Sequence, residues 1–341
     1  MSRILVVNAG STSLKLSIVD EAGTSRQIDS FEQAEDEVDA VAHRVVHGGA
    51  RFSDPVVLDA GVRAALDELT ELAPLHNRPA LVAIGEAMTI LPDIPHIAVF
   101  DTAFHRTIPA EASTYALPSR WRDEWGIRRF GFQGLSVQWS AEQVRVPRLV
   151  VCHLGGGCSV TAVRDGRSVD TTMGFSPLEG VPMATRSGSI DTEIVLHLLR
   201  TGKLDVDEIE DALQTESGLL GLSGETAQVE ELERSSSPGA ELALGVFAHR
   251  VAAAVAAMTV SLDGIDALVF TAGIGEGSAS VRRDVCRRLR FLGVELDEDA
   301  NAALVAGTGA DIAAAGAGVR IVVVHAREDV VAARAAANML G

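Results

Sequence analysis

The chain contains two copies of one local pattern, in which an apolar strand runs into a small-residue turn and an alternating strand follows. The first copy spans residues 4–20 (ILVVNAGSTSLKLSIVD), and the second spans residues 149–170 (LVVCHLGGGCSVTAVRDGRSVD). An apolar run, a glycine-containing turn and then alternation of apolar and polar residues are typical of a β-hairpin. Because the copies begin far apart in the chain, they predict a duplicated sheet unit in two halves that face each other across a cleft.

Both turns have the composition of a phosphate cradle. Glycine lets the backbone approach a ligand closely, and unpaired backbone N–H groups in such a turn attract an anion. The turn residues and their polar neighbours are Asn8, Ser11, Thr12, Ser13 and Lys15 in the first copy, and Gly155, Gly156 and Gly157 in the second. An ordinary hairpin with a polar turn explains either copy alone about equally well. Two such hairpins across one cleft favour a phosphoryl-transfer enzyme.

The length of 341 residues is too great for one small core and predicts two domains. We expect them at residues 1–147 and 148–327, with a C-terminal helix over about 328–341 that returns to the first domain. A hydrophobic content of 47% with 22% charged residues is typical of a globular chain. The net charge of −18 argues against nucleic-acid binding, because there is no basic excess to neutralise phosphates.

The cysteines and the N-terminus predict a cytoplasmic location. The three cysteines form no CxxC pair, and an odd number is typical of reduced thiols. The strand pattern begins at Ile4 without a basic segment before it, which predicts no signal peptide. The apolar helix expected around residues 251–260 is too short and too rich in alanine to span a bilayer, so no membrane partner is expected.

A third element of the same kind lies in the second half. Residues 267–283 (ALVFTAGIGEGSASVRR) predict a buried strand, a Gly-rich loop and the start of a helix, whose N-terminus attracts phosphate. A G-x-G match alone is a weak signal. Asp101 follows the apolar strand expected over residues 95–100, and ligands of α/β folds bind where strands end.

Nine sequence blocks, in matching order, resemble the acetate kinase (acetokinase) family of the acetate and sugar kinase, Hsc70 and actin superfamily. They are NAGSTSLK (8–15), HRVVHGG (43–49), PLHN (74–77), VFDTAFH (99–105), GFQGLS (131–136), CHLGGG (152–157), MGFSPLEGV (173–181), TRSG (185–188) and FTAGIGE (270–276). The resemblance implies an α/β fold of two actin-like (ribonuclease H-like) domains, with mixed sheets flanked by helices and a cleft between them. It also implies reversible phosphoryl transfer from ATP to acetate.

The resemblance implies a role for each matching position. Asn8 and Glu328 would hold Mg²⁺, with Mn²⁺ as an alternative, through the phosphates. Arg44 and Arg186 would clamp the substrate carboxylate and the moving phosphoryl group, and Asp101 would orient Arg44 or act as the acid/base group. The other implied catalytic residues are Gln133 and His153, and the acetate pocket would comprise Val46, Leu75, His76, Phe132 and Pro177 beside Arg44. The phosphates and nucleotide would contact Ser11, Thr12, Ser13, Lys15, His153, Leu154, Gly155, Gly156, Gly157, Gln228, Val229, Glu230, Gly273, Ile274, Gly275, Glu276 and Gly277.

The chain departs from the family pattern at several of these positions. Gln133 replaces a histidine that would help to stabilise the transferring phosphoryl group, and Gly156 and Gly277 each replace an asparagine. In the block beside the adenine, Gln228 and Glu230 stand where the family has an aspartate and an arginine. The substrate side therefore matches the family, whereas the nucleotide side is altered.

Three function classes follow from this resemblance. The first is an acetate kinase, or a related kinase that uses propionate, butyrate or another donor such as pyrophosphate. The second is a phosphatase on the same scaffold, which the uncharged Gln133 would permit and the two arginines and the apolar pocket oppose. The third and weakest is a binding or regulatory protein without turnover. The family implies a homodimer.

Overall fold

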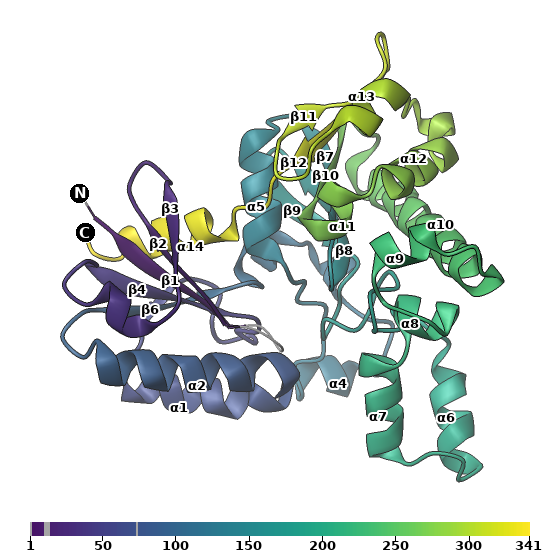
Figure 1. The fold of residues 1–341 in the computed structure, drawn as a ribbon. Coiled ribbons are helices and arrows are strands. Elements are labelled where there is room, and N and C mark those ends of the chain that lie inside the picture. Colours follow the sequence, from purple (N-terminus) through teal and green to yellow (C-terminus); the bar gives the residue numbers. More distant parts are fainter. Residues whose placement is uncertain (1, 10–13, 73) are drawn as a thin grey trace.

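The computed structural model describes residues 2–9, 14–72 and 74–341, and only the backbone of residues 71, 72 and 74–76. Its framework is a pair of six-stranded mixed sheets, each flanked by helices (Figure 1). This confirms the predicted α/β class with two mixed sheets.

The first sheet has the strand order β3-β2-β1-β4-β6-β5. Its strands are β1 (Ile4–Ala9), β2 (Leu14–Val19), β3 (Ser25–Ile28), β4 (Ala40–Val45), β5 (Val56–Val57) and β6 (His96–Phe100). Strands β1, β2 and β3 form an antiparallel meander, whereas β4 and β6 continue the sheet parallel to β1. The short strand β5 closes the edge in antiparallel orientation.

The second sheet repeats this topology strand for strand, in the order β9-β8-β7-β10-β12-β11. Its strands are β7 (Arg148–Leu154), β8 (Cys158–Arg164), β9 (Arg167–Thr171), β10 (Ala267–Thr271), β11 (Ala310–Asp311) and β12 (Arg320–Val324). An antiparallel meander is again followed by two parallel strands and an antiparallel edge strand. The duplication predicted from the two Gly turns is therefore confirmed over six strands of each sheet.

Each sheet is buried on both faces, which explains why its central strands are continuous apolar runs. In the first sheet, α2 (Pro74–Ile90) covers the face that carries Leu5 and Val7, and α14 (Glu328–Ala337) covers the face of Ile4 and Val6 (Figure 1). The C-terminal helix thus packs on the first sheet. In the second sheet, α10 (Pro238–Leu262) and α5 (Gly134–Gln143) take the equivalent places. The boundaries at residues 147 and 327 stay a prediction.

Helices α5 and α14 link the two sheets. Trp139 of α5 packs into the core clusters of both sheets, and its indole Nε1 donates to the carbonyl of His325 at 2.9 Å. Arg334 of α14 donates to both carboxylate oxygens of Glu142 in α5, at 2.8 and 2.6 Å. The sheets are therefore held together by an apolar contact and an ion pair.

The remaining helices lie mainly around the second sheet (Figure 1). They are α1 (Ala60–Glu68), α3 (Ala110–Ser113), α4 (Ser119–Asp123), α6 (Thr192–Arg200), α7 (Val206–Thr215), α8 (Gly218–Ser223), α9 (Val229–Arg234), α11 (Ala272–Gly277), α12 (Ala279–Arg288) and α13 (Glu298–Ala303). Four 3₁₀ turns complete the description: η1 (Phe31–Ala34), η2 (Leu69–Leu72), η3 (Ala103–Thr107) and η4 (Arg290–Leu292). Asp205 and Glu208 form the reciprocal N-terminal capping box of α7 that their spacing predicts.

The structure corrects one expectation about backbone. The glycine-rich segment after β10 is the short helix α11 rather than a loop. The first residue of this helix, Ala272, has a left-handed backbone conformation (φ +66°). The buried guanidinium of Arg282 donates to the carbonyls of Gly275 and Glu276 at 2.9 and 2.8 Å, and so satisfies the helix end.

The apolar helix expected around residues 251–260 is longer than predicted, because it is part of α10. Within the described residues, α10 is one helix that is long and apolar enough to cross a membrane by length and composition alone. Nine of its residues are buried, among them Phe247, Val251 and Val255. These three belong to the core cluster of the second sheet. The helix is therefore part of the core of this fold.

A cavity of about 1310 Å³ opens where η3, α5 and α14 meet the β8–β9 turn. Its floor is apolar, with Leu135, Val144 and Val331, and arginines such as Arg145 and Arg167 lie around it. None of the residues predicted for the functional site lines this cavity.

Candidate active site

Three of the predicted site residues form a row across the first sheet. Asn8 of β1 lies opposite Lys15 of β2 and opposite Arg44 of β4. Residues that face each other across neighbouring strands project to the same side of the sheet. Ser11, Thr12 and Ser13, in the turn between β1 and β2, lie outside the described residues.

Arg44 is the centre of a partly buried polar cluster. Its Nε and Nη2 donate to the two carboxylate oxygens of Asp101, at 2.8 and 2.6 Å. Its Nη1 donates to Oδ1 of Asn8 at 2.9 Å and lies 3.2 Å from Oε2 of Glu328. The cluster therefore joins β1, β4, the end of β6 and the first residue of α14.

The charges of this cluster support one another. Burial opposes a charge on the Arg44 side chain, but the carboxylates of Asp101 and Glu328 outweigh it and raise the arginine pKa. Only 2% of the Asp101 side chain is exposed, and burial raises its pKa against the pull of the Arg44 guanidinium. A two-point arginine–carboxylate pair is a strong, directional contact, and it holds the planar fork of Arg44 in one orientation.

Gln133 connects this cluster to the second sheet. The backbone N–H of Gly134 donates to the carbonyl of Asp101 at 2.9 Å, and a Cβ at residue 134 would lie 2.3 Å from that oxygen. The close approach therefore requires glycine. Gln133 itself has φ +62°, a conformation that costs a non-glycine residue free energy and often marks a functional site. Its Oε1 accepts from the hydroxyl of Ser159 in β8 at 2.6 Å.

The second Gly turn lies against Gln133 and Arg186. A Cβ on Gly157 would be 3.1 Å from Nε2 of Gln133 and 3.5 Å from Nη1 of Arg186, so both donor groups approach the same point of the turn. Nη1 of Arg186 also donates to the carbonyl of Pro177 at 3.1 Å. Burial lowers the pKa of Arg186, but an arginine this basic stays charged at neutral pH.

His153 is buried at the end of β7, and its Nδ1 lies 2.8 Å from the hydroxyl of Ser136 in α5. Burial, reinforced by the charge of Arg44, lowers its pKa to about 4. The imidazole is therefore neutral at pH 7 and acts there as a hydrogen-bonding group.

Two residues predicted for the acyl pocket, Val46 and Phe132, are apolar and closely packed. Val46 and Phe132 belong to the same core cluster and are 7% and 1% exposed. Pro177 lies in the loop between β9 and α6 and supplies the carbonyl that holds Arg186. The side chains of Leu75 and His76 lie outside the described residues.

In the second half of the chain, the predicted nucleotide residues lie at three places: the end of β7 with the turn after it, helix α11, and the start of α9. Leu154 ends β7 and is fully buried, and a Cβ on Gly155 would lie 3.5 Å from Cβ of Ala272. The second Gly turn and the Gly-rich segment after β10 are thus adjacent. A Cβ added to Gly156, Gly273 or Gly277 would meet no atom within 4 Å, so the space beside these three glycines is open. Within α11, by contrast, Gly275 and Glu276 are buried and Ile274 is partly buried.

The altered adenine block lies at the start of α9. Val229 is buried, whereas Gln228 and Glu230 are exposed, and Glu230 pairs at 3.9 Å with Arg234 of its own helix. Glu233 of α9 accepts from the hydroxyl of Ser278 at 2.5 Å, which attaches α9 to the start of α12.

The segment before α14 has its own contacts. Glu276 accepts from the backbone N–H of Ala326 at 3.0 Å, and its other oxygen lies 2.7 Å from Nδ1 of His325. Arg327 donates to the carbonyl of Gly23 at 2.8 Å and to Asp329, so its side chain is committed to the first sheet. The segment that delivers Glu328 to Arg44 is therefore fixed on both sides.

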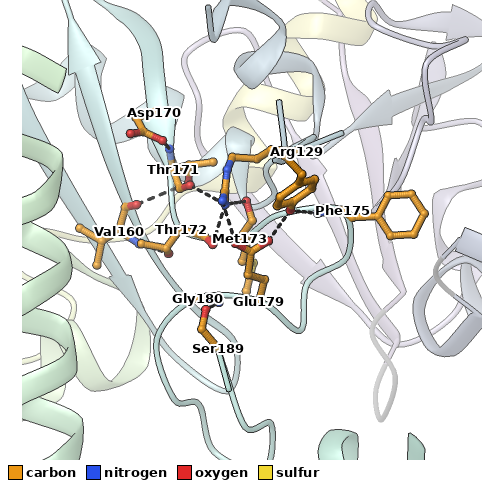
Figure 2. Close-up of polar contacts among 11 residues, drawn as sticks. Arg129, Val160, Asp170, Thr171, Thr172, Met173, Phe175, Glu179, Gly180 and Ser189 are labelled. Atoms are coloured by element: carbon orange, nitrogen blue, oxygen red, sulfur yellow. Dashed lines mark hydrogen bonds and ion pairs between the residues drawn. The ribbon is translucent and has the colours of Figure 1, made fainter. Parts of the chain in front are cut away.

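Several residues of the site region were not predicted from the sequence. Arg129, Glu179 and Tyr115 form a polar cluster at the loop between β9 and α6, and Figure 2 labels Arg129 and Glu179 of this cluster. Ser136 and Ser159 contact His153 and Gln133. Glu179 lies inside the block at residues 173–181, and Arg129 lies two residues before the block at residues 131–136. Their position in or near these blocks was the sequence signal that could have indicated them.

Two six-stranded mixed sheets of repeated topology, with a partly buried arginine cluster on the first of them, define a phosphotransferase of the actin-like fold. The family model of the acetokinase family matches residues 24–334. An acetate kinase from Gloeobacter violaceus is 46% identical over 311 residues, which cover 87% of this chain and 76% of the relative.

Solved structures of similar proteins support the same family. A propionate kinase from Francisella tularensis superposes with a TM-score of 0.91 at 33% identity, over 98% of this chain and 99% of the other. An acetate kinase from Porphyromonas gingivalis gives a TM-score of 0.87 at 29% identity, over 100% of both chains. The chain belongs to the acetokinase family and is a phosphotransferase with a carboxylate acceptor.

The buried histidines predict a loss of stability in acid. Burial lowers the pKa of His47, His105 and His153 to about 4 each. In the unfolded chain they would titrate near their usual value, so between about pH 6.5 and 4 the unfolded state binds more protons. The contribution of these neutral histidines to the free energy of unfolding is therefore fully present above pH 6.5. It falls as the pH drops toward 4, by up to about 1.4 kcal/mol per pH unit for each histidine.

Thermal unfolding between pH 7.5 and 4.5 measures this effect. His105→Gln is expected to make the decline shallower, and the control His249→Gln, at an exposed position, is expected to leave it unchanged. A melting temperature that is constant from pH 6.5 to 4.5 would contradict the assignment of neutral buried histidines.

Proposed function

We propose that the protein is a Mg²⁺-dependent acetate kinase, which reversibly transfers the γ-phosphoryl group of ATP to acetate by direct in-line transfer. The observation that carries this proposal is the Arg44 cluster, in which Asp101 holds one edge of the guanidinium by two hydrogen bonds. A guanidinium fixed in this way has one defined orientation, and a planar group of donors suits a carboxylate or phosphoryl group.

Arg44 and Arg186 would bind the two reacting groups. Phosphoryl transfer passes through a loose, anionic transition state, so catalysis depends on position and charge stabilisation. Arg186 and the amide of Gln133 both approach Gly157, which supports a role in which they would donate to the equatorial oxygens of the phosphoryl group. His153, neutral at pH 7, would add a hydrogen bond.

Asp101 would orient Arg44 rather than remove a proton. Both of its oxygens accept from the arginine, which leaves it poorly placed to act as a base. Acetate at neutral pH is already a carboxylate and has no proton to lose. Of the two roles implied by the resemblance, the contacts favour the orienting one.

Asn8 and Glu328 fit the metal that the family implies. Amide and carboxylate oxygens are the ligands that Mg²⁺ prefers. Oδ1 of Asn8 and Oε2 of Glu328 lie 2.9 and 3.2 Å from the same atom, Nη1 of Arg44, so the two oxygens are close to each other. Among the described residues no group of three or more His, Cys, Asp or Glu side chains is placed to hold a metal, so substrate phosphates would supply the other ligands. When bound, Mg²⁺ would neutralise charge on those phosphates.

The packing around Val46 and Phe132 supports a short acyl chain. Phe132 is 1% exposed in the core cluster, so a longer chain would have to displace well-packed groups. Acetate, or propionate as the alternative, is favoured over butyrate.

The phosphoryl donor is tested by trapping acyl phosphate with hydroxylamine. The enzyme is incubated with acetate, Mg²⁺ and one of ATP, GTP or pyrophosphate, and the acetyl hydroxamate is measured. We expect product with ATP. Product with pyrophosphate alone would overturn ATP as donor and favour the alternative suggested by the exposed Gln228 and Glu230. Phosphate release without acetate would favour a phosphatase.

Gln133 offers a prediction of its own. Gln133→Ala removes a donor aimed at Gly157 and is expected to lower kcat by about 10²-fold. Gln133→His is expected to raise kcat, because histidine tolerates a left-handed backbone and can carry a charge. Steady-state kinetics with acetate and ATP measure both, and wild-type turnover in Gln133→Ala would remove this residue from the mechanism.

We also propose a cytoplasmic homodimer with no nucleic-acid or membrane partner. The cysteines Cys152, Cys158 and Cys286 are all free and buried. Helix α6 has no buried residue, and the apolar side chains of Ile194 and Leu196 are exposed. Contact with a second copy of the chain would cover these side chains, which supports self-association.

A further inference from the structure

The loop between β9 and α6 is anchored by a polar cluster from a distant part of the chain (Figure 2). The carboxylate of Glu179 accepts from Nη2 of Arg129 at 2.7 Å and, on its other oxygen, from the hydroxyl of Tyr115. Nη1 of Arg129 donates to the carbonyls of three successive residues of the loop entrance: Thr171, Thr172 and Met173, at 2.9, 2.9 and 3.1 Å. The guanidinium also lies 5.4 Å from the centre of the Tyr115 ring.

Tyr115 holds the loop through a second contact. Its oxygen accepts from the backbone N–H of Phe175 at 2.8 Å while its O–H donates to Glu179. Burial, together with the bond to Glu179, raises the pKa of the phenol, so it keeps its proton. The packing is tight, because a Cβ on Gly174 would lie 2.0 Å from the Tyr115 oxygen and 1.6 Å from Oε2 of Glu179.

The anchored loop in turn holds two residues of the proposed site. The carbonyl of Phe175 lies 3.3 Å from Nε2 of His47, whose ring packs edge-on against Phe132 at 5.2 Å between centroids. The carbonyl of Pro177, two residues along, accepts from Arg186. Movement of this loop would therefore shift a pocket wall and an arginine of the clamp together.

We propose that Tyr115, Arg129 and Glu179 are positioning residues that set which acyl chain length the site accepts. The inference rests on the proposed acyl kinase function. The loop has no regular secondary structure between β9 and α6, so individual hydrogen bonds hold its path, and the contacts of Tyr115 and Arg129 are among them. Loss of one buried hydrogen bond typically weakens such a constraint by about tenfold in an equilibrium constant.

The test compares acetate and propionate as substrates of Tyr115→Phe. This change keeps the ring and removes only the oxygen that joins Phe175 to Glu179. We expect KM for acetate to rise about tenfold and the preference for acetate over propionate to fall several-fold, about threefold or more. KM for the nucleotide is expected to change by less than about twofold, because the hydrogen bonds of the cluster described above reach none of the residues predicted to bind the nucleotide.

Two further variants separate positioning from general stability. Glu179→Gln keeps an acceptor for Tyr115 but removes the charge opposite Arg129, and it should alter the acetate preference in the same direction. The control Glu37→Gln breaks an ion pair with Arg26 that is exposed on both sides, and it should leave all parameters unchanged.

The outcomes distinguish this inference from the function on which it rests. Wild-type enzyme that makes no acyl phosphate overturns the proposed function and this inference with it. If the wild-type enzyme makes acyl phosphate, and Tyr115→Phe and Glu179→Gln both keep its turnover and its preference for acetate over propionate, this inference alone is overturned. A lower melting temperature with kcat and every KM unchanged would assign the cluster to stability and likewise overturn it.

Discussion

Replacement of Arg186 by alanine is expected to lower kcat/KM for acetyl phosphate formation by about 10³-fold while the protein stays folded. Arg186 lies beside Gly157 and Gln133, where it would stabilise charge that develops on the transferring phosphoryl group. No other cation is expected to replace it, because a planar two-point donor contacts two phosphoryl oxygens at once. The measurement is steady-state hydroxamate formation, with circular dichroism to confirm the fold.

Two further variants sharpen this prediction. Arg186→Lys keeps the charge without the fork and should recover only a small part of the loss. Arg200→Ala, in an exposed ion pair with Glu193 on α6, should retain wild-type activity. Near-normal turnover of Arg186→Ala would remove this arginine from the transition state and, with it, the proposed clamp.

Replacement of Arg44 by alanine is expected to reduce both activity and stability. Activity should fall by about 10³-fold, because the group that would bind the acceptor is lost. The free energy of unfolding should fall by about 3 kcal/mol, since the change leaves the Asp101 carboxylate buried without its two-point partner. Urea denaturation and hydroxamate formation measure the two effects separately.

The double variant Arg44→Ala with Asp101→Ala distinguishes the two causes. Without the carboxylate there is no unpaired buried charge, so stability should recover in part while activity stays low. Equal destabilisation of the single and double variants would show that the ion pair does not carry the stability of this cluster.

The duplicated framework was predictable from the sequence because its signals are local. Apolar strands with a Gly-containing turn produce the β1–β2 and β7–β8 hairpins, and the spacing of Asp205 and Glu208 marks the start of α7. The structure adds the edge strands β5 and β11, each only two residues long, which no pattern of alternation could reveal.

The parts that were not predicted depend on contacts between distant residues. Helix α11 forms where a loop was expected, because Arg282 satisfies the carbonyls at its end. Tyr115 and Glu179 are 64 residues apart in the chain, and neither belongs to a local motif for the other. Arg327 reaches the carbonyl of Gly23, 304 residues earlier in the chain.

For the site, the blocks of the resemblance indicated residues that the fold brings together. Asn8, Arg44, Asp101 and Glu328 come from four elements and meet at one guanidinium. Sequence alone left two roles open for Asp101, and only the two-point contact with Arg44 favours one of them.

The fate of the γ-phosphoryl group tests the central claim most directly. With ATP labelled in the γ position, Mg²⁺ and enzyme, we expect the label to appear in acetyl phosphate when acetate is present. Without acetate, we expect ATP to remain intact, because a kinase site excludes water as the acceptor. Release of labelled inorganic phosphate at the same rate with or without acetate would contradict the account, since it would show that water accepts the phosphoryl group.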